Sequence, residues 1–326
     1  MVTLLLIIAL TAAVYIAQNK LGQEVIEEAG SSVHADHSSE YLVYKDEMYP
    51  VKNRLSTVLL IGTDNFIADA DQIIEGKNRN RDLADFLVLL VIDHNAKTVS
   101  PLQFNRDTIC DVPWLDERGY VGGYRQEHLT YAHSYGSGKE DSCINTVKAV
   151  RRLIFNAPIE SYLAFTMDAV PIINDLVGGV TVKLEDSLPD LGAEYVKGAS
   201  LKLDGSASLR FIRYRENTGG SNWFRMQRQR LYLDAFMEAA RTGLYQDSEL
   251  TLKAIDKINP YLTTNMTVNS LSAFVEYLND YTFEDTFTPT GDIVPGKEYY
   301  EFYVHEDSLW SSVHKIYCVE EAGTAD

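Results

Sequence analysis

The stretch Asp85-Phe-Leu-Val-Leu-Leu-Val-Ile-Asp93 is continuously apolar between its two aspartates. A second such run, Thr57-Val-Leu-Leu-Ile-Gly62, precedes it, and the segment Thr98–Phe104 follows it after a His94-Asn-Ala-Lys97 turn. Short apolar runs rich in Val, Ile and Leu, bounded by turn signals, are typical of strands buried on both faces of a sheet. We therefore expect these three segments to form the buried centre of a sheet.

Helical patterns alternate with the strands along the rest of the chain. Apolar residues recur at helical spacing from Cys143 to Ile154, behind Asp141-Ser142 as the helix start. A short helix, Asp168–Val177, is expected between the strands Tyr162–Thr166 and Val180–Leu184. This alternation, without tandem repeats, predicts a single three-layer α-β-α domain with a central mixed β-sheet. We place that domain at residues 54–320, followed by a short tail at 321–326.

The N-terminus carries an apolar run, Val2–Ala17, which is slightly shorter than the ~20 residues of a transmembrane helix. We expect an uncleaved membrane anchor at residues 1–19 and a polar stalk at 20–53. A cleaved signal peptide and a buried core helix are the alternatives. Both membrane interpretations place the bulk of the chain outside the cytoplasm, and the preferred one makes it a single-pass protein of the cell membrane.

The net charge disfavours one class of partner, and the cysteines raise the question of a disulfide. The formal net charge is −18 and the pI is about 4.8. This balance argues against nucleic acid, whose binding requires a broad basic surface.

The cysteines are Cys110, Cys143 and Cys318. An exported setting permits a disulfide, for which Cys110 with Cys143 is the first choice, and buried free thiols are the alternative.

Six arginines are concentrated in residues 210–230: Arg210, Arg213, Arg215, Arg225, Arg228 and Arg230. We expect a strand over Leu209–Arg215, which would place Arg213 and Arg215 on one face. A helix that begins near Asn222 would place Arg225, Arg228 and Gln229 on another face. Unpaired guanidinium groups repel one another, and a helix N-terminus offers free N–H groups. The pattern predicts a bound phosphate.

Further polar clusters follow the predicted strands, where sites in α/β sheets usually lie. They are Gly62-Thr63-Asp64-Asn65, the run Arg79-Asn-Arg-Asp82 that leads to Asp85, and Asn105-Arg106-Asp107-Thr108. Two or three carboxylates beside several arginines suit a divalent cation together with a pyrophosphate. Mg²⁺ favours such a site because it typically takes one or two protein carboxylates and completes its shell with substrate phosphates.

From about Leu59 to Gln229 the chain resembles the LytR–CpsA–Psr family of bacterial envelope phosphotransferases. The resemblance rests on six stretches in order: Leu60-Ile-Gly-Thr-Asp64, Asp85-Phe-Leu-Val-Leu-Leu-Val, Asn105-Arg-Asp-Thr108, Asp175-Leu-Val-Gly-Gly-Val180, Leu203-Asp-Gly-Ser-Ala-Ser-Leu-Arg-Phe-Ile-Arg-Tyr-Arg215 and Arg225-Met-Gln-Arg-Gln229. It implies a membrane-anchored phosphotransferase that moves a glycopolymer from an undecaprenyl-pyrophosphate carrier to peptidoglycan. The lipid tail would lie in an apolar tunnel between the sheet and its helices.

The resemblance also implies roles for individual residues. Asp64 and Asp85 would hold Mg²⁺. The pyrophosphate would be gripped by Arg106, Arg213, Arg215, Arg225 and Gln229. Further substrate contacts would come from Arg81, Asp107, Arg228 and Asn222. For Asp107 we favour a pairing with an arginine that holds its loop over a general-base role.

Several positions depart from the family pattern. Leu83-Ala-Asp85 stands where the family has Arg-Ser-Asp, so Arg79 or Arg81 would replace the missing arginine. Asn105 replaces proline, and Asn222 replaces aspartate. The segment His128-Leu-Thr130 stands where Lys-Ile-Asn is expected. Two alternative functions therefore stay open, a lipid-pyrophosphate hydrolase and a non-catalytic envelope protein that binds polyprenyl phosphates.

Overall fold

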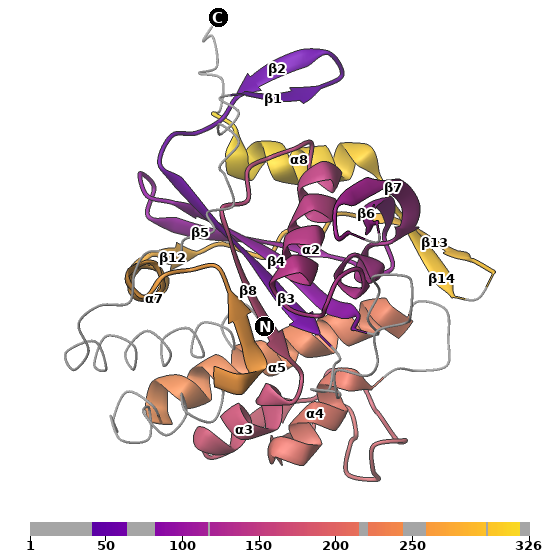
Figure 1. Cartoon of the computed structure of the whole chain (residues 1–326). Helices are drawn as coiled ribbons and strands as arrows, with labels where there is room; N and C mark the ends of the chain where they lie inside the picture. The colour runs from indigo at the N-terminus through magenta and orange to yellow at the C-terminus, as the bar shows by residue number, and fades with distance from the viewer. Residues whose placement is uncertain are drawn as a thin grey trace, which may run out of the picture.

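A computed structural model describes residues 41–63, 82–116, 118–214, 221–243, 259–297 and 299–319. Its centre is a six-stranded sheet with the order β11-β8-β3-β4-β5-β12 (Figure 1). The strand bounds are β3 Leu55–Thr63, β4 Ala84–Asp93, β5 Thr98–Phe104, β8 Ser161–Thr166, β11 Leu262–Thr264 and β12 Thr282–Phe283. The pairs β3–β8 and β5–β12 are parallel and the others antiparallel, so the predicted mixed sheet is confirmed.

Both faces of the sheet are covered, because alternate residues of its strands point to opposite sides. On β3, Val58 and Leu60 belong to one core cluster, and Leu59 and Ile61 belong to the other. The first face packs against helices α3 Ala169–Leu176, α4 Gly205–Arg213, α5 Ser221–Gly243 and α7 Val268–Asp280. The second packs against helices α2 Glu140–Leu153 and α8 Glu306–Tyr317. The three-layer arrangement follows from this division (Figure 1).

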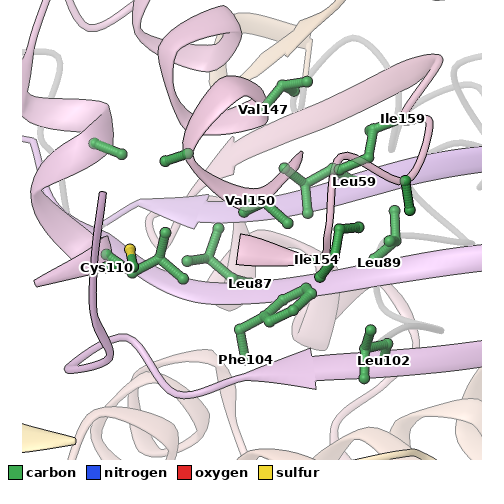
Figure 2. Packing of buried hydrophobic residues seen from close by; sticks show 14 of the residues in the cluster. Leu59, Leu87, Leu89, Leu102, Phe104, Cys110, Val147, Val150, Ile154 and Ile159 are labelled. Carbon is green, nitrogen blue, oxygen red and sulfur yellow. The ribbon is translucent and has the colours of Figure 1, made fainter. Parts of the chain in front are cut away.

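The second core shows how the apolar pattern of the sequence is used (Figure 2). Leu87 and Leu89 of β4 belong to one buried cluster with Val147 and Val150 of α2, and all four are 7% exposed or less. Burial of each such side chain stabilises the fold by about 1.5–3 kcal/mol before conformational entropy is subtracted. The apolar residues that the sequence places at helical spacing in α2 are therefore the ones that face the sheet.

Smaller elements surround the sheet: the hairpins β1 Tyr41–Tyr44 with β2 Glu47–Pro50, β6 Ile109–Leu115 with β7 Val121–His128, β9 Val180–Lys183 with β10 Ser200–Leu203, and β13 Gly291–Pro295 with β14 Tyr300–Val304, and the 3-10 turns η3 Leu129–Ser134 and η5 Asn259–Tyr261. The first hairpin lies within the segment assigned to the stalk. It packs on α8, where the rings of Tyr44 and Trp310 stack at 4.4 Å. Leu42 is fully buried. Residues 41–50 are therefore part of the folded domain.

The strand predicted over Leu209–Arg215 is wrong, because residues up to Arg213 belong to helix α4. The side chain of Asp204 caps this helix by accepting a hydrogen bond of 2.7 Å from the Ala207 N–H. The buried residues Ser208, Phe211 and Ile212 follow a helical spacing. Capping and this apolar face outweigh the β propensity of the short Phe-Ile-Arg-Tyr run.

The expected Cys110–Cys143 disulfide is also wrong: all three cysteines are free and buried. The Cys143 thiol faces the ring of His133, with Sγ 3.8 Å from Nε2, and does not meet Cys110. The predicted anchor at residues 1–19 lies outside the described residues. Within the described ranges, no helix combines the length and apolar character needed to cross a membrane.

Candidate functional site

Asp85 lies at a bulge where four strands of the sheet meet at one edge. Strands β3, β5 and β8 end here, and β4 begins. Thr63 pairs with Ala84 and Gly62 pairs with Phe86, which leaves Asp85 as the extra residue of β4. Bulges kink a strand and redirect a side chain, and they are frequent beside active sites. The bulge thus places a carboxylate, only 6% exposed, at the ends of the strands.

Two arginines from distant segments meet this carboxylate. Arg106, in the turn after β5, pairs with Oδ1 of Asp85. Arg225, on α5, lies with Nη1 3.3 Å from Oδ2 and donates from Nη2 to the main-chain oxygen of Asp85. Arg106 also donates from Nε to Oδ1 of Asp107 over 3.1 Å. The convergence of Arg106 and Arg225, predicted from separate motifs, is present in the structure.

Within this quartet (Asp85, Arg106, Asp107 and Arg225) the formal charges cancel, so it does not carry the excess positive charge expected for the site. Both carboxylates already contact guanidinium groups, and Arg225 is 2% exposed. Burial of an ion pair costs the hydration energy of both charges, and the attraction between them offsets this cost only when the geometry is good and further hydrogen bonds form. The quartet therefore fixes its side chains firmly, and an incoming anion must compete with the carboxylates for the arginines.

The loop that carries Arg106 is shaped by its own polar groups. The Asn105 side chain accepts a hydrogen bond of 3.0 Å from the Asp107 N–H, which closes an Asx turn. Thr108 Oγ1 donates to the Asn105 carbonyl over 2.6 Å. Asparagine thus builds the turn at the position where the family pattern has proline. Asp107 holds the Arg106 side chain in the same loop, as the sequence interpretation favoured.

The other predicted arginines do not join the quartet through the contacts described above. Arg213 is exposed at the last residue of α4. Arg228 is buried, donates from Nη2 to the Tyr214 carbonyl, and lies 5.1 Å above the Tyr214 ring. Gln229 is buried with Nε2 3.5 Å from the Ile212 carbonyl. Because the last carbonyls of a helix lack intrahelical partners, Arg228 and Gln229 serve as caps of α4 from α5.

Asp64, Arg81 and Arg215 lie outside the described residues, as does the side chain of Asn222. The proposed Mg²⁺ site can therefore be tested only at Asp85. This carboxylate fits one position in the shell of a cation that keeps several oxygen ligands from water and phosphate. Among the described residues, no group of three His, Cys, Asp or Glu side chains could hold a metal alone.

Two buried titratable groups, Asp82 and His133, are not among the site residues predicted from the sequence. Burial raises the pKa of Asp82, three residues before Asp85, to about 6. Burial lowers the pKa of His133 to about 4, against the opposing effects of the Asp141 charge and a hydrogen bond to the Asp82 main chain. Asp82 appeared in sequence only as one residue of a polar run. Its proximity to a buried strand was the available signal.

A cavity of about 330 Å³ lies along α5, and the sequence analysis missed it. Its floor is one helical face, made of Trp223, Met226, Gln227, Arg230, Leu231 and Asp234. Gln103 of β5, together with Glu185 and Thr288, completes the lining. The i, i+3, i+4 and i+7 spacing of these α5 residues was the signal that could have found it.

A family model described as the LytR_cpsA_psr family matches residues 16–309. The chain belongs to the LytR–CpsA–Psr family. It is 25% identical over 243 residues to the polyisoprenyl-teichoic acid–peptidoglycan teichoic acid transferase TagU of Oceanobacillus iheyensis, a match that covers 73% of this chain and 68% of TagU.

Solved structures agree on the fold. The structure of TagT bound to LI-WTA matches with a TM-score of 0.59 and 20% identity, and covers 80% of this chain and 89% of that chain. A family structure of YwtF (TagT) with bound octaprenyl pyrophosphate lipid matches with a TM-score of 0.56 and 18% identity, over 85% of this chain and 95% of that chain. These likenesses establish the shared architecture.

The motif Asp175-Leu-Val-Gly-Gly-Val180 has a structural role in the fold. Gly178 and Gly179 take positive φ values of 77° and 91° and end α3, a conformation that favours glycine. Asp175 Oδ1 accepts a hydrogen bond of 2.7 Å from the N–H of Gly205, the first residue of α4. The fully buried Asn174 side chain bonds the Leu203 carbonyl and the Tyr232 hydroxyl of α5. Asp175 of the motif and the preceding Asn174 therefore fix the helices that carry Arg213 and Arg225.

Proposed function

We propose that this chain is a membrane-anchored phosphotransferase that moves a glycopolymer from an undecaprenyl-pyrophosphate carrier to peptidoglycan. The convergence of Asp85, Arg106 and Arg225 at the strand ends is the observation that carries the proposal. Membership of the family supports it, as do the names of relatives, which are teichoic acid transferases. The octaprenyl pyrophosphate bound to the related TagT supports a polyprenyl-linked donor.

In this mechanism the protein mainly positions and neutralises charge, because phosphoryl transfer needs little covalent chemistry from the enzyme. Arg106 and Arg225, with Arg213, Arg215 and Gln229, would bind the pyrophosphate oxygens. Asp107 keeps Arg106 in its loop, and Arg106 would exchange its contact with Asp85 for the anion when the donor binds. A sugar hydroxyl of the acceptor attacks the phosphorus nearest the glycan, and undecaprenyl phosphate leaves.

Asp64 and Asp85 would hold the Mg²⁺ ion. When bound, the ion would supply charge neutralisation at the phosphate oxygens. The pairing of Asp85 with Arg106 and Arg225 suits this arrangement, because a carboxylate that turned to a cation would free both arginines for the anion. Arg81, Arg228 and Asn222 stay proposed as further substrate contacts.

The location of the protein is part of the proposal. Residues 1–19 would anchor it in the cell membrane as a single-pass protein, with the folded domain outside the cytoplasm. A lipid-borne donor then meets the wall beside the membrane. Its tail would lie between the sheet and the layer of α3, α4 and α5.

Arg213→Ala tests this function most cleanly, because Arg213 is exposed and its loss should not disturb the core. We expect at least a tenfold fall in kcat/KM, about 1.4 kcal/mol of lost transition-state stabilisation, for Mg²⁺-dependent release of polyprenyl phosphate from a lipid-linked glycan. Arg210→Ala, also exposed on α4, is the matched control and should keep wild-type activity.

Product analysis with peptidoglycan present identifies the acceptor. Glycopolymer attached to peptidoglycan supports the transferase. Free glycan phosphate as the sole product would replace it with the hydrolase, and binding without turnover would leave the non-catalytic envelope protein. Equal activity of Arg213→Ala and wild type would remove Arg213 from the site.

A further inference from the structure

The cavity along α5 contains a buried amide that has no partner. Gln103 is 7% exposed and lines this cavity. Its neighbour Leu102 belongs to the second core, so the Gln103 side chain points to the opposite face of β5, toward α5. Among the described residues, the side-chain amide of Gln103 has no hydrogen-bond partner. Burial of an amide is costly unless its donor and acceptor are both satisfied, so this side chain indicates a polar ligand in the cavity.

The cavity begins beside the quartet. Met226, a lining residue that is 6% exposed, directly follows Arg225 on α5. Gln103 precedes Arg106 by three residues, which is about 10 Å at the rise of a strand. A molecule held in the cavity therefore lies next to the groups proposed to bind the pyrophosphate.

The polar groups on the cavity walls include both donors and acceptors. Arg230 can donate, Glu185 and Asp234 can accept, and Gln227 and Thr288 can do both. Within the part of the chain that the structure describes, none of these five side chains forms a hydrogen bond or an ion pair. Each hydroxyl of a sugar also combines a donor with an acceptor. A pyranose can therefore use this mixture of groups.

The apolar part of the lining suits the ring of such a sugar. Trp223, which is 37% exposed, lies in the first turn of α5 and places its indole at the cavity. The electron-rich face of an indole attracts the weakly positive C–H groups on one side of a pyranose. The volume of about 330 Å³ is at the lower end of ligand sites, which range over about 300–1,000 Å³. Such a space suits a short piece of a glycan.

Two other parts of the proposed substrate fit this cavity less well. A polyprenyl tail has no hydrogen-bonding groups, so it would cover the Gln103 amide and the charged walls without satisfying them. A phosphate would face two carboxylates, Glu185 and Asp234, against the single guanidinium of Arg230. An uncharged sugar avoids both penalties.

We propose that this cavity binds an uncharged N-acetylated sugar unit, with the Gln103 amide and the Trp223 ring as its main contacts. An acetamido group carries the same donor and acceptor as a glutamine side chain, so the two can bond each other. This inference rests on the proposed function, which supplies two sources of such a sugar. One is the donor glycopolymer next to its pyrophosphate, and the other is the glycan strand of peptidoglycan.

The test measures binding of tetra-N-acetylchitotetraose to the full chain in detergent micelles by isothermal titration calorimetry. We expect Gln103→Leu and Trp223→Ala each to bind at least about tenfold more weakly than wild type. Phe224→Ala is the matched control and should bind as wild type, because Phe224 is 42% exposed beside Trp223 but lies outside the cavity lining.

Urea unfolding of the same variants separates binding from folding. Gln103→Leu should keep the stability of wild type, because it removes a buried amide that has no partner. Trp223→Ala changes a partly exposed residue and keeps the test valid if Gln103→Leu alters the fold. Wild-type protein that does not bind the tetrasaccharide would overturn the proposal, as would wild-type affinity in both variants.

Octaprenyl pyrophosphate with and without one N-acetylglucosamine distinguishes the two sources. A donor sugar in the cavity makes the sugar-bearing lipid bind more tightly than the bare lipid, and Gln103→Leu should remove this difference. An acceptor sugar leaves the two lipids equal, and the variants then co-sediment less with insoluble peptidoglycan. Either result supports the sugar site. Weaker binding of the bare lipid by both variants would assign the cavity to the lipid and overturn it.

The bare lipid also keeps this proposal apart from the proposed function. Wild-type protein that fails to bind octaprenyl pyrophosphate would overturn the proposed function. Normal binding of this lipid, with sugar binding unchanged by Gln103→Leu and Trp223→Ala, would overturn only the sugar site.

Discussion

The coupling between Asp85 and Arg225 is the sharpest stability prediction of the structure. Arg225 contacts Asp85 twice at 3.3 Å, once at the carboxylate and once at the main-chain oxygen, and both side chains are less than 5% exposed. Removing one partner of a buried ion pair is strongly destabilising because the other charge stays buried. Arg225→Ala, Asp85→Ala and the double variant form a thermodynamic cycle that measures this interaction.

The magnitudes follow from the partners that remain. Breaking a buried pair typically lowers the free energy of unfolding by about 3–5 kcal/mol. We expect the lower end, about 3 kcal/mol, for each single variant, because Arg106 still pairs with Asp85 and the Asp85 carbonyl still accepts from Arg225. The double variant should lose about 4 kcal/mol, which leaves a coupling of about 2 kcal/mol.

Urea unfolding, monitored by tryptophan fluorescence at one pH and salt concentration, gives the four free energies. The control cycle uses Arg210→Ala in place of Arg225→Ala. Arg210 is exposed on α4, so its variant should show no coupling to Asp85. A coupling below about 0.5 kcal/mol between Asp85 and Arg225 would refute the pair as an energetic unit. The contacts of the quartet would then contribute little to the stability of the fold.

Two further predictions concern buried titratable groups. The pKa of Asp82 is raised to about 6, so the folded state holds this proton more tightly than the unfolded chain, and stability falls as pH rises from about 4 through 6. Asp82→Asn should therefore raise the free energy of unfolding by about 2–3 kcal/mol at pH 8 and by almost nothing at pH 4; an equal effect at both pH values would contradict the burial argument. Burial also raises the pKa of all three cysteine thiols, so a thiol reagent at pH 8 should label none of them in the folded protein and all three in urea; rapid labelling of the folded chain would show that these sites open.

The sheet was predictable from sequence because its central strands are buried on both faces. A short, continuously apolar run such as Asp85–Asp93 must be buried on all sides, and a central strand of a covered sheet provides this. The same local signals failed at Leu209–Arg215, where alternating apolar and basic residues fit a strand and a helix almost equally. Two contacts just outside the segment decide for the helix: the local cap by Asp204, and the hydrogen bond from the Gly205 N–H to Asp175, which lies 30 residues earlier in the chain.

The site shows a different limit of sequence reasoning. The family motifs were expected to place Arg106, Arg225 and Asp85 in one site, and the structure brings them into contact: Asp85 and Arg106 lie at strand ends, and Arg225 reaches them from α5. The arginine count alone predicted excess positive charge, but it could not reveal that Asp85 sits at a bulge between two guanidinium groups. A carboxylate in that position can pair with the arginines or bind a cation. Both roles use an aspartate, so the residue type alone does not distinguish them. Asp85 can serve only one of the two roles at a time, so the proposed cation at Asp85 and the proposed anion at Arg106 and Arg225 would favour each other's binding.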